Sequence, residues 1–173
     1  MLDILLEAPG DTPEIETLLD LSFGPDRLKK RSYHYRRGVP PIRELCLVVR
    51  DPGRSEIVGG IRYWPVTIGQ MATPALLLGP LAIKPERRGT GVGAALMRQS
   101  LARAEAMGHR VVVLVGDLAY YGRFGFSPAQ PRGIFMSQEV PERVLAAELQ
   151  PGALDGVVGA IHRWRPKQRS KAA

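Results

Sequence analysis

Three alternate glycines, Gly89, Gly91 and Gly93, lie between the apolar segment "PALLLGPLAI" (74–83) and an amphipathic stretch that runs to about Met107. A glycine inside a helix costs about 1 kcal/mol relative to alanine, so such a cluster needs a local reason. One reason is a backbone that must approach a bulky group closely with its N–H groups pointing outward. The amides of a helix N-terminus, with arginines beside them, form a binding site for phosphate. The cluster therefore predicts a strand, a phosphate-binding loop and a helix, in that order.

Three phosphate-binding motifs compete for this loop. A Walker A loop is excluded because no lysine followed by serine or threonine comes after the glycines. The dinucleotide motif G-x-G-x-x-[GA] matches Gly89, Gly91 and Ala94, but it requires the strand to end at the first glycine. Here five residues separate the expected strand from that glycine. The third motif, [QR]-x-x-G-x-[GA], is satisfied by Arg88, Gly91 and Gly93 at the expected start of the helix.

This third match resembles the acetyl-CoA loop of the GNAT superfamily of N-acetyltransferases. The resemblance extends from Leu76 to Phe126 through "LGPLAIKPERRGTGVGAALM", "VVVLVGD" and "YYGRFGF". Their order is that of the family's strand, pyrophosphate loop, helix, second strand and Tyr-x-x-x-Gly-Phe element, which is Tyr121, Gly125 and Phe126 here. The segments "GDLAYYGRFGFSPA" and "PGALDGVVG" are further similar to a small bacterial branch of the superfamily, the YhbS-like proteins.

The resemblance implies an enzyme that uses acetyl-CoA as co-substrate and no metal. Backbone N–H groups of residues 88–94 would meet the pyrophosphate, and Arg87 or Arg88 would add a charge-assisted contact. Because proline cannot donate to a β-ladder, we expect a bulge or splay at Gly79–Pro80. The exposed amides of Leu81–Ile83 would then pair with the pantetheine arm as an added strand does. The expected cofactor-binding residues are Leu81, Ala82, Ile83, Arg87, Arg88, Gly89, Thr90, Gly91, Val92, Gly93 and Ala94.

The implied reaction is direct attack of an amine on the thioester, with release of CoA. By the resemblance, the N–H of Leu81 polarises the thioester carbonyl, and Tyr121 is the catalytic acid that protonates the leaving thiolate. In histone-type members an acid lies four residues before the position of Leu81, where this chain has Leu77. The general base therefore stays open between Glu44, Asp117, His34 and a water held by strand carbonyls.

The 173 residues fit one domain, 1–173, with a basic tail at about 165–173. Strands are predicted at 2–8, 44–50, 57–69, 74–83, 109–116 and 157–164, and helices at 11–23, 26–38, from the glycines to about 107, in a short piece around 117–121 and near 142–148. This order indicates an α+β or α/β domain with a mixed sheet, of which we expect the α+β class. The resemblance implies a three-layer α/β/α arrangement with a mixed, splayed central sheet flanked by helices.

A net charge of +7 is concentrated in two clusters, Arg27–Arg37 and Arg163–Lys171. Such a balance favours anionic partners, and without a recognised nucleic-acid motif we do not expect nucleic acid. The amine acceptor, a small molecule or a protein, is expected over residues 24–43 and Trp64, with Arg27–Arg37 tuning its choice. The segment "RSYHYRR" there fits either recognition of an anionic or aromatic acceptor or an exposed helix face. A non-catalytic acyl-CoA sensor of the same fold is the alternative function, and a monomer or homodimer is the expected assembly.

The N-terminal segment lacks the basic region of a signal peptide, and the longest apolar runs are too short to span a bilayer. The single cysteine, Cys46, excludes an internal disulfide and suits a reducing compartment. We therefore expect a cytoplasmic protein without a membrane partner, in which Cys46 is a buried strand residue.

Overall fold

The computed structural model describes residues 3–51, 53 and 55–166. Their main sheet has the strand order β1-β2-β3-β4-β5-β8-β6; β9 pairs with β3, and β7 pairs with β9. The strands are β1 (Asp3–Leu6), β2 (Leu47–Arg50), β3 (Ile57–Ile68), β4 (Thr73–Ile83), β5 (Val111–Val115), β6 (Ser127–Pro128), β7 (Ile134–Phe135), β8 (Val144–Glu148) and β9 (Gly159–Arg163). The helices are α1 (Thr12–Phe23), α2 (Val92–Ala106) and the short α3 (Leu118–Tyr121).

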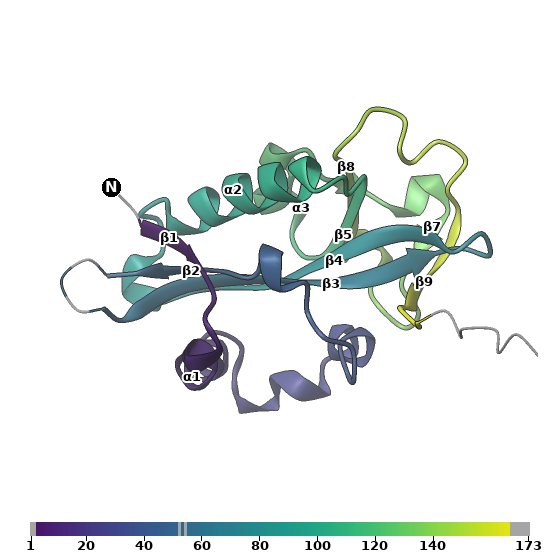
Figure 1. The fold of residues 1–173 in the computed structure, drawn as a ribbon. Helices are drawn as coiled ribbons and strands as arrows, with labels where there is room; N and C mark the ends of the chain where they lie inside the picture. The colour runs from purple at the N-terminus through teal and green to yellow at the C-terminus, as the bar shows by residue number, and fades with distance from the viewer. Residues whose placement is uncertain (1–2, 52, 54, 167–173) are drawn as a thin grey trace, which may run out of the picture.

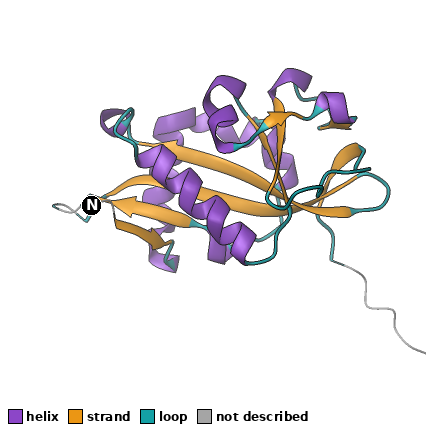
Figure 2. Ribbon diagram, turned by 90° about the horizontal axis from the view of Figure 1, so that it is seen from above, coloured by secondary structure: helices purple, strands orange, loops and turns teal. Residues whose placement is uncertain are grey.

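The sheet lies between two helical layers (Figure 1). One face is covered by α2 and α3, and the other by α1 and the segment that follows it. Seen from above, α2 crosses the long central strands (Figure 2). The pairing is antiparallel from β1 to β4, parallel between β4 and β5, and antiparallel between β5 and β8. The predicted α+β class with a three-layer arrangement and a mixed sheet is confirmed.

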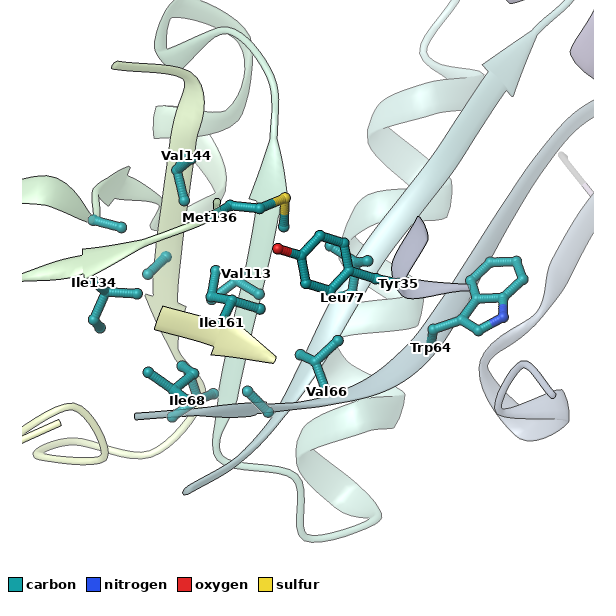
Figure 3. Close-up of a cluster of buried hydrophobic side chains, with 14 of the residues drawn as sticks. Tyr35, Trp64, Val66, Ile68, Leu77, Val113, Ile134, Met136, Val144 and Ile161 are labelled. Carbon is teal, nitrogen blue, oxygen red and sulfur yellow. The ribbon is translucent and has the colours of Figure 1, made fainter. Parts of the chain in front are cut away.

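Side chains of β4 alternate between two cores, as the period of two in a strand requires. Leu76 and Leu78 pack in the cluster beneath α2, whereas Ala75 and Leu77 pack in the cluster on the opposite face. Figure 3 shows this second cluster, in which Leu77 lies next to Tyr35. Both faces of β4 are therefore buried, and this strand holds the two layers together.

Close packing of α2 on β3 depends on a glycine. A Cβ atom built on Gly59 would lie 2.8 Å from Val92 Cγ1 and 2.9 Å from Ile83 Cδ1. The start of α2 and the end of β4 therefore approach β3 more closely than any side chain at position 59 permits. This contact fixes where the α2 N-terminus lies relative to the end of β4.

The predicted helix over 26–38 is wrong. The structure has two 3-10 helices there, Pro25–Lys29 and Arg31–Tyr35, separated by Lys30 in an extended conformation. Two physical causes explain the difference from the predicted helix. Arg27 is drawn inward, where only 4% of it is exposed, by ion pairs with α1, and closely spaced like charges along a helix repel each other.

The predicted helix near 142–148 is also wrong. Pro141–Arg143 is a 3-10 helix and Val144–Glu148 is β8, in antiparallel register with β5 from Val111↔Glu148 to Val115↔Val144. Alanine favours a helix in isolation. Here the backbone of β5 offers hydrogen bonds over the whole segment, and Val144 to Ala147 are buried on both faces. Tertiary pairing thus overrides local propensity.

Other boundaries differ less. The strand predicted from residue 44 begins at Leu47, because Arg43–Leu45 is a 3-10 helix, and the last strand, expected at 157–164, is the shorter β9. Most of the predicted basic tail, residues 167–173, lies outside the described residues, as does Leu2 of the first predicted strand. No described helix combines the length and apolar character that a membrane crossing requires.

Candidate active site

The sheet opens between β4 and β5. These parallel strands pair only at Leu76↔Val112 and Leu77↔Val113. Beyond Leu77, β4 stays with β3 while β5 leads away toward α3. The predicted splay of the sheet is therefore confirmed, and its apex lies at Leu77.

A bulge in β4 coincides with the opening. Opposite it on β3, Tyr63 faces Leu78 and Ile61 faces Leu81, so two steps along β3 correspond to three along β4. The additional backbone belongs to Gly79–Pro80, the position where the sequence predicts a bulge. Gly79 has φ of +119°, which side-chain-bearing residues rarely adopt.

Two cavities meet at the splay. The first, which we call the loop cavity, has a volume of about 490 Å³. It is lined by Ser22, Phe23, Leu81, Ala82, Ile83, Arg87, Arg88, Gly89, Gly91, Gly93, Ala94, Tyr120, Tyr121 and Arg123. The second, the splay cavity, has a volume of about 620 Å³. It is lined by Phe23, Lys30, Arg31, Ser32, Tyr33, Arg36, Leu77, Leu78, Gly79, Pro80, Leu81, Val115, Gly116, Asp117, Tyr120, Tyr121, Glu139 and Arg143.

The glycine loop forms one end of the loop cavity. Gly89 and Gly91 have φ of +76° and +90°, and Gly91 is the N-cap of α2. A Cβ built on either glycine meets no atom within 4 Å. The first N–H groups of a helix have no partner within it, and the α2 N-cap makes no side-chain hydrogen bond. The loop thus presents bare amides to an open space, as anion binding requires.

Gly93 is glycine for another reason. It lies inside α2, and a Cβ there would be 2.7 Å from the hydroxyl oxygen of Tyr120. The ring of Tyr120 also packs against the guanidinium of Arg123, whose central carbon lies 4.3 Å from the ring centroid. Tyr120 and Arg123 therefore close the loop cavity from the α3 side, which the sequence did not predict.

The two arginines before the loop differ in their contacts. Arg87 forms an ion pair with Asp51. Arg88 is exposed, and its Nε lies 3.4 Å from the carbonyl oxygen of Ile83. Both line the loop cavity, but only Arg88 has a guanidinium not paired with a carboxylate of the described residues.

Two predicted residues do not line either cavity. The hydroxyl of Thr90 donates to the carbonyl of Arg87 at 2.6 Å, which orders the loop internally. The side chain of Val92 is 2% exposed and belongs to the core beneath α2. Only the backbone of Val92 is available to a ligand at this helix end.

Ser22 is a lining residue that sequence reasoning missed. Its Oγ is fully buried and has no hydrogen-bond partner among the described residues. Such a group is costly to bury unless a ligand or water satisfies it. Ser22 therefore adds an unsatisfied polar group to the wall of the loop cavity.

Tyr121 lies where the two cavities join. Its ring rests on Gly116, where a Cβ would come within 2.3 Å of Tyr121 Cε2. Edge contacts with Tyr120 and Phe126, at centroid distances of 4.9 and 6.0 Å, hold the ring from other sides. Burial raises the pKa of Tyr121 to about 12, and the nearby Tyr120 and Asp117 add to this shift. The phenol is therefore neutral across the physiological pH range.

The residues considered as a base are dispersed. Glu44 is exposed in the 3-10 helix before β2, and His34 lines another surface cavity with His162. Asp117 lines the splay cavity with a side chain 79% exposed, 3.9 Å from Arg143. The structure adds a carboxylate that the sequence did not indicate, because Glu139 lines the same cavity.

Leu77 and Cys46 have structural surroundings. Leu77 is 1% exposed in the apolar cluster with Tyr35 (Figure 3), so the position offers no proton acceptor. Cys46 is buried directly before β2, and its Sγ donates to the carbonyl of Ile42 at 3.3 Å. Burial raises the pKa of the Cys46 thiol to about 11, which leaves it unreactive at neutral pH.

The basic segment after α1 forms part of the splay cavity. Of the predicted acceptor region, residues 30–33 and Arg36 line it, whereas Tyr35 is in the core. Trp64 does not line the cavity, but its ring packs against Arg36. Within the described residues, no group of three or more His, Cys, Asp or Glu is arranged to hold a metal ion.

Comparisons with known proteins agree with this arrangement. The family model described as an acetyltransferase (GNAT) domain matches residues 7–129. The uncharacterized N-acetyltransferase YhbS of Escherichia coli K12 is 30% identical over 91% of this chain and 93% of its own. A crystal structure of E. coli YhbS in complex with CoA has a TM-score of 0.82 and 28% identity, covering 94% of this chain and 89% of its own. A crystal structure of a GNAT family acetyltransferase from Brucella melitensis in complex with acetyl-CoA has a TM-score of 0.69 and 26% identity. The match covers 94% of this chain and 95% of the Brucella chain.

The raised pKa of Tyr121 predicts a distinct alkaline titration. The folded pKa of about 12 exceeds the unfolded value of about 10, so its contribution to stability is complete below pH 10. That contribution is lost as the pH rises from 10 to 12. Ultraviolet titration of phenolate in the wild type and in Tyr121→Phe should differ only above about pH 11. A difference centred near pH 10 would show that the ring is solvated.

Proposed function

Because the chain belongs to the GNAT acetyltransferase family, we propose that it transfers the acetyl group of acetyl-CoA to a primary amine of a small molecule or a protein. The observation that carries this proposal is the continuity of the loop cavity with the splay cavity. Leu81, Tyr120 and Tyr121 line both. A donor held in the first cavity and an acceptor in the second would meet at these residues. The complexes of the E. coli relative with CoA and of the Brucella relative with acetyl-CoA support the choice of donor.

The glycine loop is proposed to hold the pyrophosphate of acetyl-CoA. The backbone at Gly89 and Gly91 borders an open space, and the positive end of the α2 dipole lies there. The guanidinium of Arg88 supplies a charge-assisted hydrogen bond. Arg87 is proposed to fix the loop through Asp51 and so contributes its charge at longer range.

The open edge of β4 is proposed to bind the pantetheine arm. Leu81, Ala82 and Ile83 pair on one side with β3, and their other side lines the loop cavity. Amide groups of the arm would add to this edge as a further strand. The thioester carbonyl then lies at the N–H of Leu81, which stabilises negative charge on that oxygen during attack.

Tyr121 is proposed to stabilise the leaving thiolate. Its pKa of about 12 lies about 3.5 units above that of a free thiol, so complete proton transfer costs roughly 5 kcal/mol. The phenol therefore stays protonated, and it can donate a hydrogen bond to the developing thiolate without itself ionising. We therefore assign Tyr121 a hydrogen bond in the transition state, and the thiolate takes its final proton from water or the acceptor.

The attacking amine must lose a proton. With a pKa near 10.4, only about one alkylamine in a thousand is neutral at pH 7. Glu139 is the less exposed of the two carboxylates in the splay cavity, and one of its oxygens accepts a hydrogen bond from the N–H of Val140 at 3.2 Å. We propose Glu139, directly or through a water, as the proton acceptor.

A second candidate function is a sensor that binds acyl-CoA without catalysis. It is favoured by Leu77, which puts an apolar side chain where histone-type relatives of the family have an acid. The two functions differ in one measurement: release of free CoA from acetyl-CoA in the presence of amines. The location in the cytoplasm and the monomeric or dimeric state stay predictions.

Acetyl-CoA should raise the melting temperature of the chain, and Gly91→Val should abolish this shift because its Cβ occupies the space of the pyrophosphate. Gly108 is the matched control: its φ of +86° is close to that of Gly91, and it too has no atom within 4 Å. Both variants carry similar backbone strain, but Gly108→Val should keep the acetyl-CoA shift. Equal shifts in the two variants would refute the loop assignment.

Tyr121→Phe should lower kcat at least tenfold and change the Kd for acetyl-CoA by less than about twofold, since positioned donors contribute about 10²-fold or more. Tyr120→Phe removes a hydroxyl near Gly93 and should affect acetyl-CoA binding more than kcat. Thiol release under saturating acetyl-CoA measures kcat, and a thermal-shift titration with acetyl-CoA measures the change in Kd. If Tyr120→Phe were the variant that lost kcat, the roles of the two tyrosines would be reversed.

Glu139→Gln should lower kcat/KM at neutral pH at least tenfold and much less at pH 10, where the amine is largely neutral without help. Asp117→Asn, in the same cavity but exposed, should leave the pH profile close to that of the wild type. A profile of Glu139→Gln parallel to that of the wild type would assign deprotonation to solvent.

A further inference from the structure

Arg36 lies in the wall of the splay cavity and is a cation without an anionic partner in the described part of the chain. Its Nε is fully buried and has no hydrogen-bond partner among the described residues. No carboxylate of residues 3–51, 53 or 55–166 lies within ion-pair distance of its guanidinium. Buried charges in proteins are normally paired, so this arginine needs an explanation.

The nearby carboxylates are already used by other arginines. Glu16 pairs with both Arg27 and Arg62. Arg27 also pairs with Asp20, whose Oδ1 lies 2.7 Å from Arg27 Nε. Arg62 also pairs with Glu7, whose Oε1 lies 2.7 Å from Arg62 Nη2. These pairs join α1 and the segment after it to β3. None of these three carboxylates pairs with Arg36 in the described part of the chain.

The position of Arg36 is nonetheless well determined. Its guanidinium carbon lies 4.6 Å from the ring centroid of Tyr33 and 5.2 Å from that of Trp64. A Cβ on Gly79 would lie 3.3 Å from Arg36 Nη2, so the guanidinium rests against the β4 bulge. The rings of Tyr33 and Trp64 and the backbone of Gly79 thus hold the guanidinium of Arg36 in place. Gly79 lies two residues before Leu81, where the thioester is proposed to bind.

The charge of Arg36 persists at neutral pH. Burial lowers its pKa to about 10, with Tyr33 opposing the shift and Arg27 and Arg62 adding to it. The group is still protonated at pH 7. An anion arriving from the cavity would therefore relieve the cost of its burial.

The rest of the cavity has the same sign of charge. Lys30, Arg31 and Arg143 accompany Arg36, against two carboxylates, Asp117 and Glu139. The cavity volume of about 620 Å³ lies in the range of small-molecule sites. Both features suit a small anionic ligand better than a cationic peptide.

We propose that Arg36 binds a carboxylate or phosphate group of the acceptor, which makes the acceptor a small amine that also carries an anion. This substrate class rests on the proposed acetyl transfer. A guanidinium presents a planar fork that matches both anions in a bidentate manner. Amines that lack the anion leave the buried guanidinium unpaired, and discrimination by such a group is strong.

Trp64 provides a test that does not require catalysis. In a Trp164→Phe background, Trp64 is the sole tryptophan, and its ring contacts Arg36. Phosphate and acetate are titrated separately at constant ionic strength, with chloride as the reference anion. We expect a saturable change in fluorescence, with the tighter anion identifying phosphate or carboxylate as the natural group.

The variants locate the binding site. Arg36→Met should eliminate the saturable change while melting near the wild-type temperature, because an unpaired buried charge is removed. Arg36→Lys, which keeps the charge, should retain a weaker change. Lys29→Gln is the matched control, since Lys29 is exposed in the same basic segment and lines neither the splay cavity nor the cavity that holds Trp64. A change that persists in Arg36→Met, or no saturable change in the parent, would overturn the proposal.

Turnover then tests the substrate class. The paired amines are O-phosphoethanolamine with ethanolamine and β-alanine with β-alaninamide. In at least one of the two pairs, the amine that carries the anion should have a kcat/KM at least about tenfold above that of its counterpart without the anion. In Arg36→Met, the ratio of these two kcat/KM values should fall to about one. A ratio unchanged by Arg36→Met would overturn the assignment. Arg36-dependent anion binding without acetylation of any amine would leave the anion site standing and refute the transferase function instead.

Discussion

The geometry of the site depends on the loss of pairing between β4 and β5 after Leu77. Because parallel strands in one sheet ordinarily satisfy each other's backbone groups, their divergence leaves one edge of β4 open in the middle of the fold. The bulge at Gly79–Pro80 sets the direction of this edge. Gly59 lets α2 approach β3 closely enough to bring the glycine loop to the end of the edge. The proposed donor track and acceptor cavity both follow from one interruption of the sheet.

The arginines around the splay differ in whether they pair with carboxylates. Arg27 and Arg62 are neutralised by carboxylates of α1 and by Glu7, which directly follows β1. These ion pairs attach the segment after α1 to the sheet. That segment completes the splay cavity and carries Arg36 into its wall. Leaving one member of a partly buried ion pair without its partner is costly. The carboxylates that pair with Arg27 and Arg62 are therefore not free to neutralise Arg36. Arg36 is proposed to serve recognition instead, where electrostatic complementarity contributes mainly to selectivity.

Local chemistry made much of this predictable. The bulge at Gly79–Pro80 and the glycine loop follow from the backbone limits of proline and glycine, and Tyr121 was singled out because its spacing to Gly125 and Phe126 matches a family pattern. Residues 144–148 were misassigned because their strand depends on β5, which no short window contains. Glu139 escaped notice for the same reason, since it belongs to no local motif, and Arg36 was only one of several cations in the basic segment Arg27–Arg37. Their surroundings come from segments distant in the chain, and burial without a partner is visible only in three dimensions.

The most direct measurement is a crystal structure of the chain with acetyl-CoA bound. The pyrophosphate oxygens should accept hydrogen bonds from backbone amides between Arg88 and Ala94. The pantetheine arm should lie along the open edge of β4, with the thioester between the N–H of Leu81 and the hydroxyl of Tyr121. Acetyl-CoA bound elsewhere, or with its acetyl group directed away from the splay cavity, would contradict the proposed path from the glycine loop to the acceptor.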